Sequence, residues 1–379
     1  MPKIRYNNMD NVSTDKTLKE FRQWREERRK KRKDYSFTVP SVPPRLSYLK
    51  ENRLDTTITW IGHATFFIQY EGMNIVTDPV WARRMGFERR LGDPGIPLQD
   101  LPPVDLVLVS HSHYDHLHFG SLRKLWRGDT QLIVPAGLKR KMLRKGFRNC
   151  VEMQWWETIT AGNIQLTFVP TQHWTRRTPF DTNTSHWGGF VLQPATPEAH
   201  PGPTEHPGPA AYPGPTEHLS PAAHPGPPEH PGPAAYPGPS EQSRPPGQPI
   251  PPGESTAHKL PPNLYFAGDS GYFPGFKEIG ARFPIHVALM PIGAYEPEWF
   301  MTSQHVNPEE ALQAFVDVGA ETMIPMHYGT FRLADDTARE ALDRLEADRE
   351  RRGIAPERIR VLGLGETLVI HPELRKSGQ

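Results

Sequence analysis

The stretch DLVLVSHSHYDHLH, residues 105–118, decides how the rest of this chain is interpreted. Its first residues, DLVLV, are typical of a buried strand, and polar residues follow immediately. Within six residues after that strand lie His111, His113, Asp115 and His116. A turn at the strand end lets His111 and His113 face one metal ion while Asp115 and His116 face another. Imidazole nitrogens and a carboxylate suit zinc, so the stretch predicts two adjacent zinc ions.

Three further apolar strands end in a residue of ligand type: His173 in VPTQHW, Asp269 in YFAGDSG and His327 in IPMHYG. Each of these residues alone is weak evidence, because single histidines and aspartates at strand ends are commonly caps or surface groups. In a layered α/β domain, however, three such strand ends can converge on the edge where the first cluster lies. The sequence therefore predicts one metal centre built from several strand ends.

Short apolar strands alternate with helical stretches through most of the chain, which is typical of a layered α/β domain. Gly72 marks a hairpin near the start of this pattern. The predicted strands are Thr57 to Tyr70, Met73 to Thr77, Leu106 to Ser110, Gln131 to Val134, Ile164 to Val169, Trp187 to Leu192, Asn263 to Ala267, His286 to Met290, Thr322 to Met326 and Thr367 to Ile370. We expect one α/β domain over residues 51–379.

A proline-rich tandem repeat interrupts this domain over residues 194–262, where PGPTEHPGPAAYPGPTEHLSPAAH is followed by a near copy. The segment holds 23 of the chain's 43 prolines, so it has few backbone donors for a sheet ladder and almost no large apolar side chains for a core. It is predicted to be a disordered insert that hangs from a connection between two strands.

Residues 1–50 form a basic amino-terminal arm that contains LKEFRQWREERRKKRK, Leu18 to Lys33. Two interpretations stay open. The arm could be attracted to an anionic membrane or a nucleic acid. Alternatively, it is a solvated helix that packs Leu18, Phe21 and Trp24 on the main domain, as charge runs usually are.

Composition excludes several functions. With 44 basic and 43 acidic residues the formal net charge is +1, so no nucleic-acid partner is expected. The one cysteine, Cys150, excludes an intramolecular disulfide and a site of several thiolates. No apolar run reaches the roughly 20 residues that span a bilayer, and the charged amino terminus lacks a secretory core. We expect a cytoplasmic protein, which would be peripheral to the inner face of the membrane if the arm binds lipid. The sequence leaves open whether the protein forms a homodimer.

The quartet described above matches the HxHxDH signature of the metallo-β-lactamase superfamily, which the chain resembles. The resemblance implies a four-layer αβ/βα sandwich as the fold. It also implies that His173 completes the first metal site, that Asp269 bridges both metals and that His327 completes the second site.

Within that superfamily the chain is most similar to N-acylphosphatidylethanolamine-hydrolysing phospholipase D and its bacterial relatives. The phrases that carry this likeness are WIGHATFFI (60–68), TDPVW (77–81), LPPVDLVLVSHSHYDHL (101–117), QHW (172–174), WGGFV (187–191), FAGDSGYFPGFKEIG (266–280) and PIGAYEPEWFMTSQHVNPEEA (291–311). The resemblance implies cleavage of a phosphodiester in a phospholipid substrate, releasing phosphatidic acid and an N-acylethanolamine. The proline repeat and His118 depart from the pattern. The repeat puts the shape of the active-site mouth in doubt, whereas His118 is expected to be a surface change.

Three residues outside the predicted ligand set are further candidates. His305 precedes a predicted helix with Asn307 as its cap, and could contact a substrate phosphate or protonate a leaving oxygen. Asp78 could orient a ligand histidine as a hydrogen-bond acceptor, and His63 could line the cleft. The plainer alternatives are a capped histidine, a turn aspartate before proline and a strand-end histidine.

These residues support a mechanism in which a hydroxide held by two zinc ions attacks the phosphodiester, because bound cations lower the pKa of water. Asp115, Asp269 and His305 are the residues expected to take part in catalysis. The alternative within the superfamily is a lactonase or other carboxylic-ester hydrolase, since the metal ligands suit both reactions. The alternative of another class is a non-catalytic binding or scaffold protein that uses the repeat and the arm.

Overall fold

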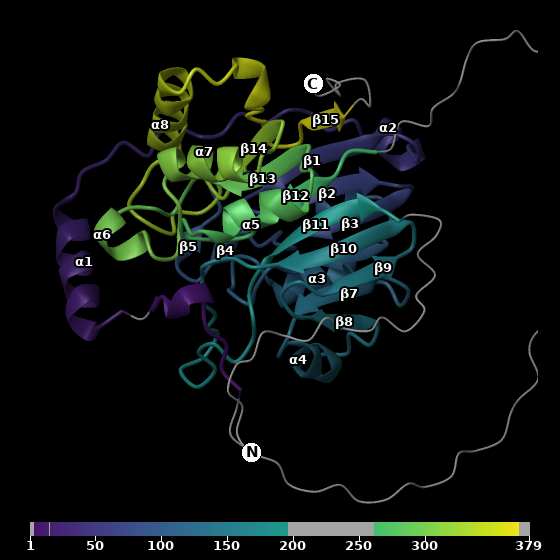
Figure 1. Cartoon of the computed structure of the whole chain (residues 1–379), viewed down its shortest axis with the longest axis horizontal. Helices are drawn as coiled ribbons and strands as arrows, with labels where there is room; N and C mark the ends of the chain where they lie inside the picture. The colour runs from purple at the N-terminus through teal and green to yellow at the C-terminus, as the bar shows by residue number, and fades with distance from the viewer. Residues whose placement is uncertain (1–3, 15, 196–260, 371–379) are drawn as a thin grey trace, which may run out of the picture. The chain divides into compact units, whose positions relative to one another are not determined.

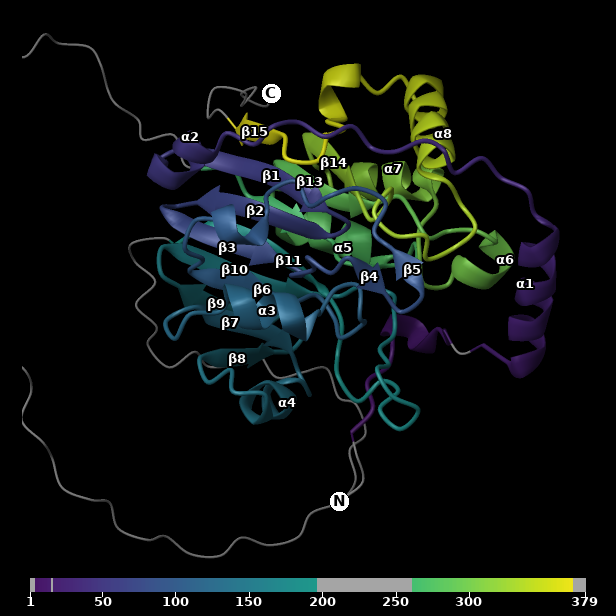
Figure 2. The ribbon, with the colours of Figure 1, turned by 180° about the vertical axis from the view of Figure 1, so that it is seen from behind.

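Two mixed β-sheets pack face to face in the computed structural model of the chain (Figures 1 and 2), which describes residues 4–14, 16–195 and 261–370. The predicted insert lies almost entirely outside the described residues. Inner faces of both sheets share one apolar core, to which Phe66 and Ile68 contribute from one sheet and Phe168 and Phe190 from the other.

The first sheet has seven strands in the order β15-β1-β2-β3-β6-β7-β8. Strands β3, β6, β7 and β8 are parallel, and the other pairs are antiparallel. Their bounds are β1 Thr56–Gly62, β2 Thr65–Tyr70, β3 Met73–Thr77, β6 Leu106–Leu108, β7 Gln131–Pro135, β8 Cys150–Met153 and β15 Thr367–Ile370.

The second sheet has six strands in the order β14-β13-β12-β11-β10-β9. Strands β11 and β12 are antiparallel neighbours although the proline-rich insert separates them in sequence, and β12, β13 and β14 are parallel. The bounds are β9 Thr158–Ala161, β10 Ile164–Val169, β11 Gly189–Pro194, β12 Leu264–Phe266, β13 Val287–Pro291 and β14 Thr322–Met326; β4 Arg84–Met85 and β5 Glu88–Arg89 form a separate small hairpin.

Strand β6, which lies near the start of residues 105–118, is buried on both faces, and this explains its uninterrupted apolar sequence. Leu106 and Leu108 point into the core between the sheets, whereas Val107 and Val109 belong to a second cluster on the outer face. Leu122 of helix α3, Phe119–Leu125, is part of that outer cluster. One three-residue strand thus joins the sandwich core to its helical cover.

Helices cover the outer faces of both sheets and complete the four-layer αβ/βα sandwich that the sequence predicts (Figures 1 and 2). Helices α3 and α4 cover the seven-stranded sheet, α5 and α7 cover the six-stranded sheet, and α8 packs on α7. The bounds are α1 Leu18–Lys30, α2 Leu46–Glu51, α3 Phe119–Leu125, α4 Lys139–Arg144, α5 Gly275–Arg282, α6 Glu298–Met301, α7 Pro308–Asp317 and α8 Ala338–Arg351, with short 3₁₀ turns at Met9–Asn11, Leu98–Asp100 and Pro356–Arg358. No helix in the described part of the chain combines the length and apolarity that a bilayer crossing requires.

The local expectations were partly wrong. The predicted single strand from Thr57 to Tyr70 is two strands, because Gly62 and His63 adopt positive φ angles of 125° and 58° and reverse the chain. Strands β8 and β9 were not predicted. His118, expected to be a surface change, is half-buried, and its Nδ1 accepts a hydrogen bond from the Ser121 amide at the start of α3.

The predicted cap of α7 is confirmed. The Asn307 side chain accepts from the Glu310 amide at 2.8 Å, and the Glu310 carboxylate accepts from the Asn307 amide at 3.1 Å, with Pro308 in the first turn. This capping box satisfies two donors at the helix start and fixes the chain direction just after His305.

Candidate metal centre

The predicted ligands meet at one edge of the two sheets. The quartet lies in the loop after β6, His173 follows β10, Asp269 follows β12 and His327 follows β14. Strands β12 and β14 run in the same direction within their sheet, so residues after their carboxyl ends emerge on the same side. All seven predicted ligands contribute to clusters whose ligand atoms lie within 4.8 Å of one another.

The first cluster contains His111, His113 and His173. His111 Nε2 lies 2.9 Å from His113 Nδ1, and His173 Nε2 lies 3.2 Å from the same atom. His111 and His173 are fully buried, whereas His113 is partly exposed. Three ring nitrogens from two different loops therefore converge on one point.

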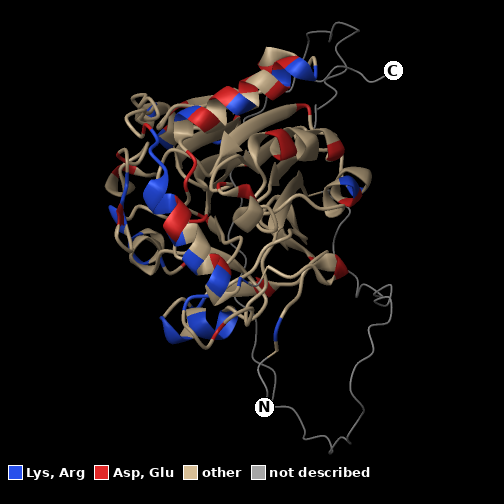
Figure 3. Cartoon of the chain, turned by 90° about the vertical axis from the view of Figure 1, so that its left-hand side faces the viewer, with Lys and Arg blue, Asp and Glu red and all other residues tan. Residues whose placement is uncertain are grey.

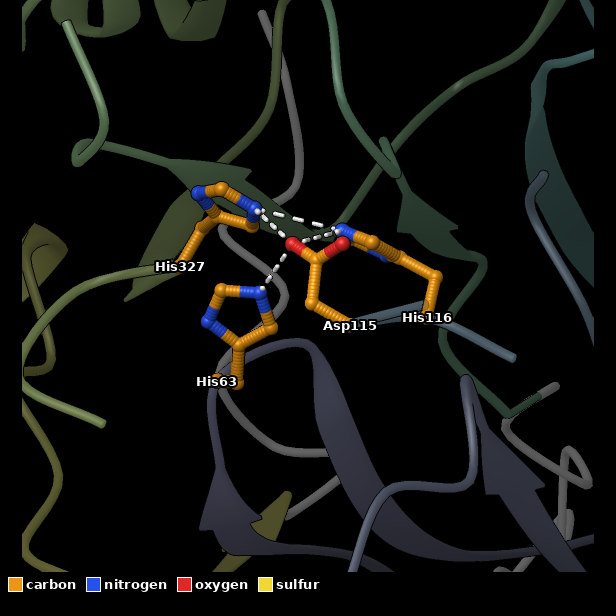
Figure 4. A group of neighbouring side chains, drawn as sticks. All are labelled: His63, Asp115, His116 and His327. Carbon is orange, nitrogen blue, oxygen red and sulfur yellow. Dashed lines mark hydrogen bonds and ion pairs between the residues drawn. The ribbon is translucent and has the colours of Figure 1, made fainter. Parts of the chain in front are cut away.

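The second cluster contains His63, Asp115, His116 and His327 (Figure 4). His116 Nε2 and His327 Nε2 are 3.2 Å apart. Asp115 Oδ2 lies 3.4 Å from His116 Nε2, 3.6 Å from His327 Nε2 and 3.0 Å from His63 Nε2. The carboxylate thus sits among three imidazoles that come from separate parts of the chain.

Asp269 lies between the two clusters. Its Oδ2 is 3.1 Å from His116 Nε2 and 3.7 Å from His173 Nε2, while its Oδ1 is 3.1 Å from His327 Nε2. The side chain is 1% exposed. With His111 Nε2 at 3.8 Å from Oδ2, this buried carboxylate contacts two histidines of the first cluster and two of the second.

The ring nitrogens of these histidines are arranged to bind a divalent metal rather than to hydrogen-bond to one another. His173 Nδ1 donates to the Gln304 carbonyl at 2.9 Å, and His116 Nδ1 donates to Asp78 at 2.7 Å, so in the neutral rings both Nε2 atoms present lone pairs. Lone pairs directed at other ring nitrogens repel unless a cation lies between them. Two nitrogens on one zinc ion, each about 2.05 Å from it, would be about 3.3 Å apart, close to the spacing seen in both clusters.

Charges within the site divide the histidines into two sets. Burial lowers the pKa of His113 to about 4 and that of His173 to about 3, so the first cluster is neutral at pH 7. Burial also lowers the pKa of His327, but Asp269 and Asp115 outweigh burial and raise it to about 9. Asp269 and Asp115 also raise the pKa of His116 well above its ordinary value, although burial alone would lower it. Protons therefore neutralise the carboxylates where a cation would, and metal binding should release them.

Asp78 contacts the site as a hydrogen-bond acceptor. Besides the His116 contact, its carboxylate accepts from the Ser110 amide at 2.7 Å and from the Ser110 hydroxyl at 2.6 Å. Burial raises the pKa of Asp78 although these contacts oppose it. The residue fixes both the ring tautomer of His116 and the start of the turn that carries the quartet.

His63 and His305 each lie close to one of the two carboxylates, His63 to Asp115 and His305 to Asp269. His63 is 1% exposed and is not among the residues that line the cavity above the site; its ring lies 4.0 Å from that of His327. His305 does line that cavity, and its Nδ1 is 3.9 Å from Asp269 Oδ2. Burial lowers the pKa of His305 to about 3, so at neutral pH its ring can donate one N–H but carries no extra proton.

A cavity of about 590 Å³ opens directly above the cluster. Four residues of the site line it, His113, Asp115, Asp269 and His305; its other walls are Tyr114, Trp174, Arg176, Arg177, Thr178, Pro179, Ala294, Met301, Gln304 and Leu333. Sequence reasoning missed these wall residues because they come from separate loops and follow no period. The adjacent arginines after QHW were the one visible signal, since cations beside a ligand suggest an anionic substrate.

Helix α1 and Lys31, the residue directly after it, contact acidic side chains of the rest of the chain. The buried Asp335 carboxylate accepts from Trp24 Nε1 at 3.2 Å and pairs with Arg28 at 3.3 Å, while Lys31 pairs with Glu296 at 3.0 Å. Figure 3 faces this side of the molecule, where basic and acidic segments alternate along the helix. Of the apolar stripe, Trp24 stacks on Phe300 and Phe21 meets the same ring edge-on, but Leu18 is 80% exposed and does not pack on the main domain.

Exposed cations remain on α1 beside the paired ones. Arg25 and Arg29 are both exposed. The packed-helix interpretation therefore agrees with the structure, and attraction of the arm to an anionic surface stays a prediction.

Sheets packed face to face, with histidines and carboxylates gathered at one loop-bearing edge, define the metallo-β-lactamase class of proteins. The family model described as the beta-lactamase superfamily domain matches residues 73–204 and 248–328, more than half of the chain, and the chain belongs to this family. The fold and the resemblance inferred from the motifs are thereby confirmed.

Two curated relatives each share 30% of their aligned residues with this chain. The chain is 30% identical over 291 residues to the N-acyl-phosphatidylethanolamine-hydrolyzing phospholipase D 1 of Caenorhabditis elegans, covering 72% of this chain and 64% of that protein. It is 30% identical over 302 residues to the mitochondrial N-acyl-phosphatidylethanolamine-hydrolyzing phospholipase D of Saccharomyces cerevisiae, covering 76% of this chain and 50% of that protein. The chain thus spans less than two thirds of these curated relatives. A metallo hydrolase from the archaeon Ignicoccus hospitalis shares the fold, with a TM-score of 0.52, 19% identity and coverage of 83% and 98%.

Proposed function

We propose that this chain is a two-zinc hydrolase that cleaves a phosphodiester in phospholipids of the N-acylphosphatidylethanolamine type. The observation that carries the proposal is Asp269, a buried carboxylate in contact with histidines of both clusters at the base of a cavity. The two relatives that bear the name of this phospholipase activity support the choice of substrate.

The predicted ligands form two sets, one for each zinc ion. His111, His113 and His173 would hold one ion, Asp115, His116 and His327 would hold the other, and Asp269, which contacts histidines of both sets, would serve as a ligand shared by the two. Bound zinc supplies Lewis acidity, which lowers the pKa of water and stabilises negative charge on a phosphoryl oxygen.

His305 is assigned a narrower role than general acid. Because burial lowers its pKa to about 3, the ring is neutral at pH 7 and has no spare proton for a leaving alcohol. Its buried Nδ1 lies near Asp269 and, among the described residues, has no hydrogen-bond partner. A phosphoryl oxygen in the cavity would give this nitrogen an acceptor if it carries the ring proton.

The cavity walls also suit a lipid phosphodiester. Trp174, Met301 and Leu333 offer apolar surface for an acyl chain, and Arg176 and Arg177 place positive charge beside it for an anionic headgroup. Apolar walls with a few convergent polar groups are typical of small-molecule sites.

The test uses the purified full chain, with zinc content measured by elemental analysis and N-acylphosphatidylethanolamine and a panel of lactones as substrates. We expect two zinc ions per chain and zinc-dependent release of phosphatidic acid, lost on chelation and restored by adding zinc. Asp269→Asn should abolish turnover, whereas Asp343→Asn, on the exposed face of α8, should not. Turnover of lactones alone would favour the carboxylic-ester alternative, and a chain that binds no metal would favour the scaffold alternative.

A further inference from the structure

The segment before α1 reaches the metal centre. The Tyr6 amide donates to the Asn183 carbonyl at 2.9 Å, and the Tyr6 ring stacks on that of His186 with centroids 4.5 Å apart. Asn8, two residues later, is only 8% exposed although it lies close to the start of the chain. Residues 4–14 therefore pack on the loop that follows His173.

Asn8 makes its contacts with the candidate ligand loop itself. Its Oδ1 accepts from the backbone N–H of His173 at 2.9 Å and from the Trp187 indole N–H at 3.0 Å. Its Nδ2 donates to the Val12 carbonyl at 3.1 Å. Both ends of the amide are thus used, one inside its own segment and the other on a residue 165 positions away.

His173 lies past the end of β10, where no ladder partner holds its amide, so the Asn8 side chain supplies the acceptor that a neighbouring strand would otherwise provide. The other end of the residue is also held, because the ring Nδ1 donates to the Gln304 carbonyl at 2.9 Å. Together these two contacts fix the main chain and the ring of His173, with Nε2 directed at His113.

We propose that Asn8 is a positioning residue of the metal centre, which holds His173 in the geometry that the first metal ion requires. The proposal rests on His173 being a metal ligand, as in the proposed function, but not on the identity of the substrate. It makes the amino-terminal segment part of the active centre rather than an appendage, because its side chain acts on the backbone of a ligand.

The experiment measures zinc affinity of the full chain by competition with a chromophoric chelator, without substrate. Asn8→Ala removes the acceptor, and we expect the affinity for the ion that His111, His113 and His173 would hold to fall about 10–100-fold, as for other groups that orient ligands. Asn8→Asp keeps an oxygen facing the His173 amide, and should restore affinity to within about fivefold of the parent, since the hydrogen bond is retained. Asn7→Ala changes the exposed neighbouring asparagine and should leave affinity unchanged.

Thermal unfolding of the metal-free chain separates positioning from general stabilisation. Tyr6→Ala removes the stacking contact that anchors the same segment without touching His173, so it should lower the melting temperature but not the zinc affinity. If Asn8→Ala does not fold, Asn8→Ser serves instead, because its shorter hydroxyl cannot reach the His173 amide and the same loss of affinity is expected.

Parent-like zinc affinity in Asn8→Ala or Asn8→Ser would overturn the proposal, as would equal losses in the Asn8→Ala and Asn8→Asp chains. A parent chain that holds no zinc overturns both this inference and the proposed function. A chain that holds zinc and shows the expected series, yet cleaves no N-acylphosphatidylethanolamine, defeats only the proposed function.

Discussion

Arg177→Met should destabilise the turn that carries four of the candidate ligands. Arg177 comes from the loop after His173, and its Nη1 donates to the carbonyl oxygens of Ser112, His113 and Leu117 at 2.7, 3.2 and 2.8 Å. Its guanidinium also lies 4.0 Å from the centre of the Tyr114 ring. A single side chain thus ties two ligand-bearing loops together.

The magnitude follows from these contacts. One Nη1 has two hydrogens, so the three carbonyls share about two hydrogen bonds, each worth about 1.5 kcal/mol for a charged donor at a partly exposed position. The ring contact adds about 0.5 kcal/mol, and methionine keeps part of the aliphatic packing. The free energy of unfolding should therefore fall by about 3 kcal/mol. With about 2.1 cal/mol/K of unfolding entropy per residue over about 300 described residues, the melting temperature should fall by about 5 °C.

Differential scanning calorimetry of the metal-free chain measures this shift. Arg176→Met is the matched control, since Arg176 is the adjacent, exposed arginine and lies over the Trp174 ring. Its melting temperature should stay within about 1 °C of the parent, as for most surface substitutions. Zinc affinity should fall with Arg177→Met because the turn that presents the ligands loosens. Melting temperatures for the two variants that agree within error would refute the reasoning.

Three further results are expected. Asp78→Asn removes the carboxylate that accepts from His116 and should weaken zinc binding about 10–100-fold in chelator competition; unchanged binding would contradict the orienting role. Burial raises the pKa of Cys150 to about 12, so the thiol stays protonated at pH 8 and a thiol reagent should label it only after denaturation; rapid labelling of the native chain would show that this burial is wrong. If the arm binds anionic membranes, Arg25→Glu combined with Arg29→Glu should reduce co-sedimentation with phosphatidylserine vesicles; equal co-sedimentation would rule out the arm as the contact.

Several parts of the molecule follow from local sequence alone. His111, His113, Asp115 and His116 stand together because they follow one buried strand within a few residues, so no distant contact is needed to bring them close. The α7 cap is equally local, since Asn307 bonds to a residue three positions on. Most strands were located from their apolar runs, whereas the reversal at His63 was missed because positive φ at a histidine has no reliable sequence signal.

Only the tertiary structure decided how the separate strand ends combine. The strand-end pattern predicted that Asp269 lies near the quartet, and the family resemblance implied that it bridges two metals, but its contacts with both histidine clusters depend on the packing of one sheet against the other. The same holds for Asn8 against His173 and for Arg177 against the quartet turn. These contacts join residues tens to hundreds of positions apart through irregular loops, where neither periodicity nor spacing records which groups meet. The geometry of these contacts is determined by where the paired strands end and how the loops pack. Residues throughout the core contribute to that packing, so no single stretch of sequence predicts it.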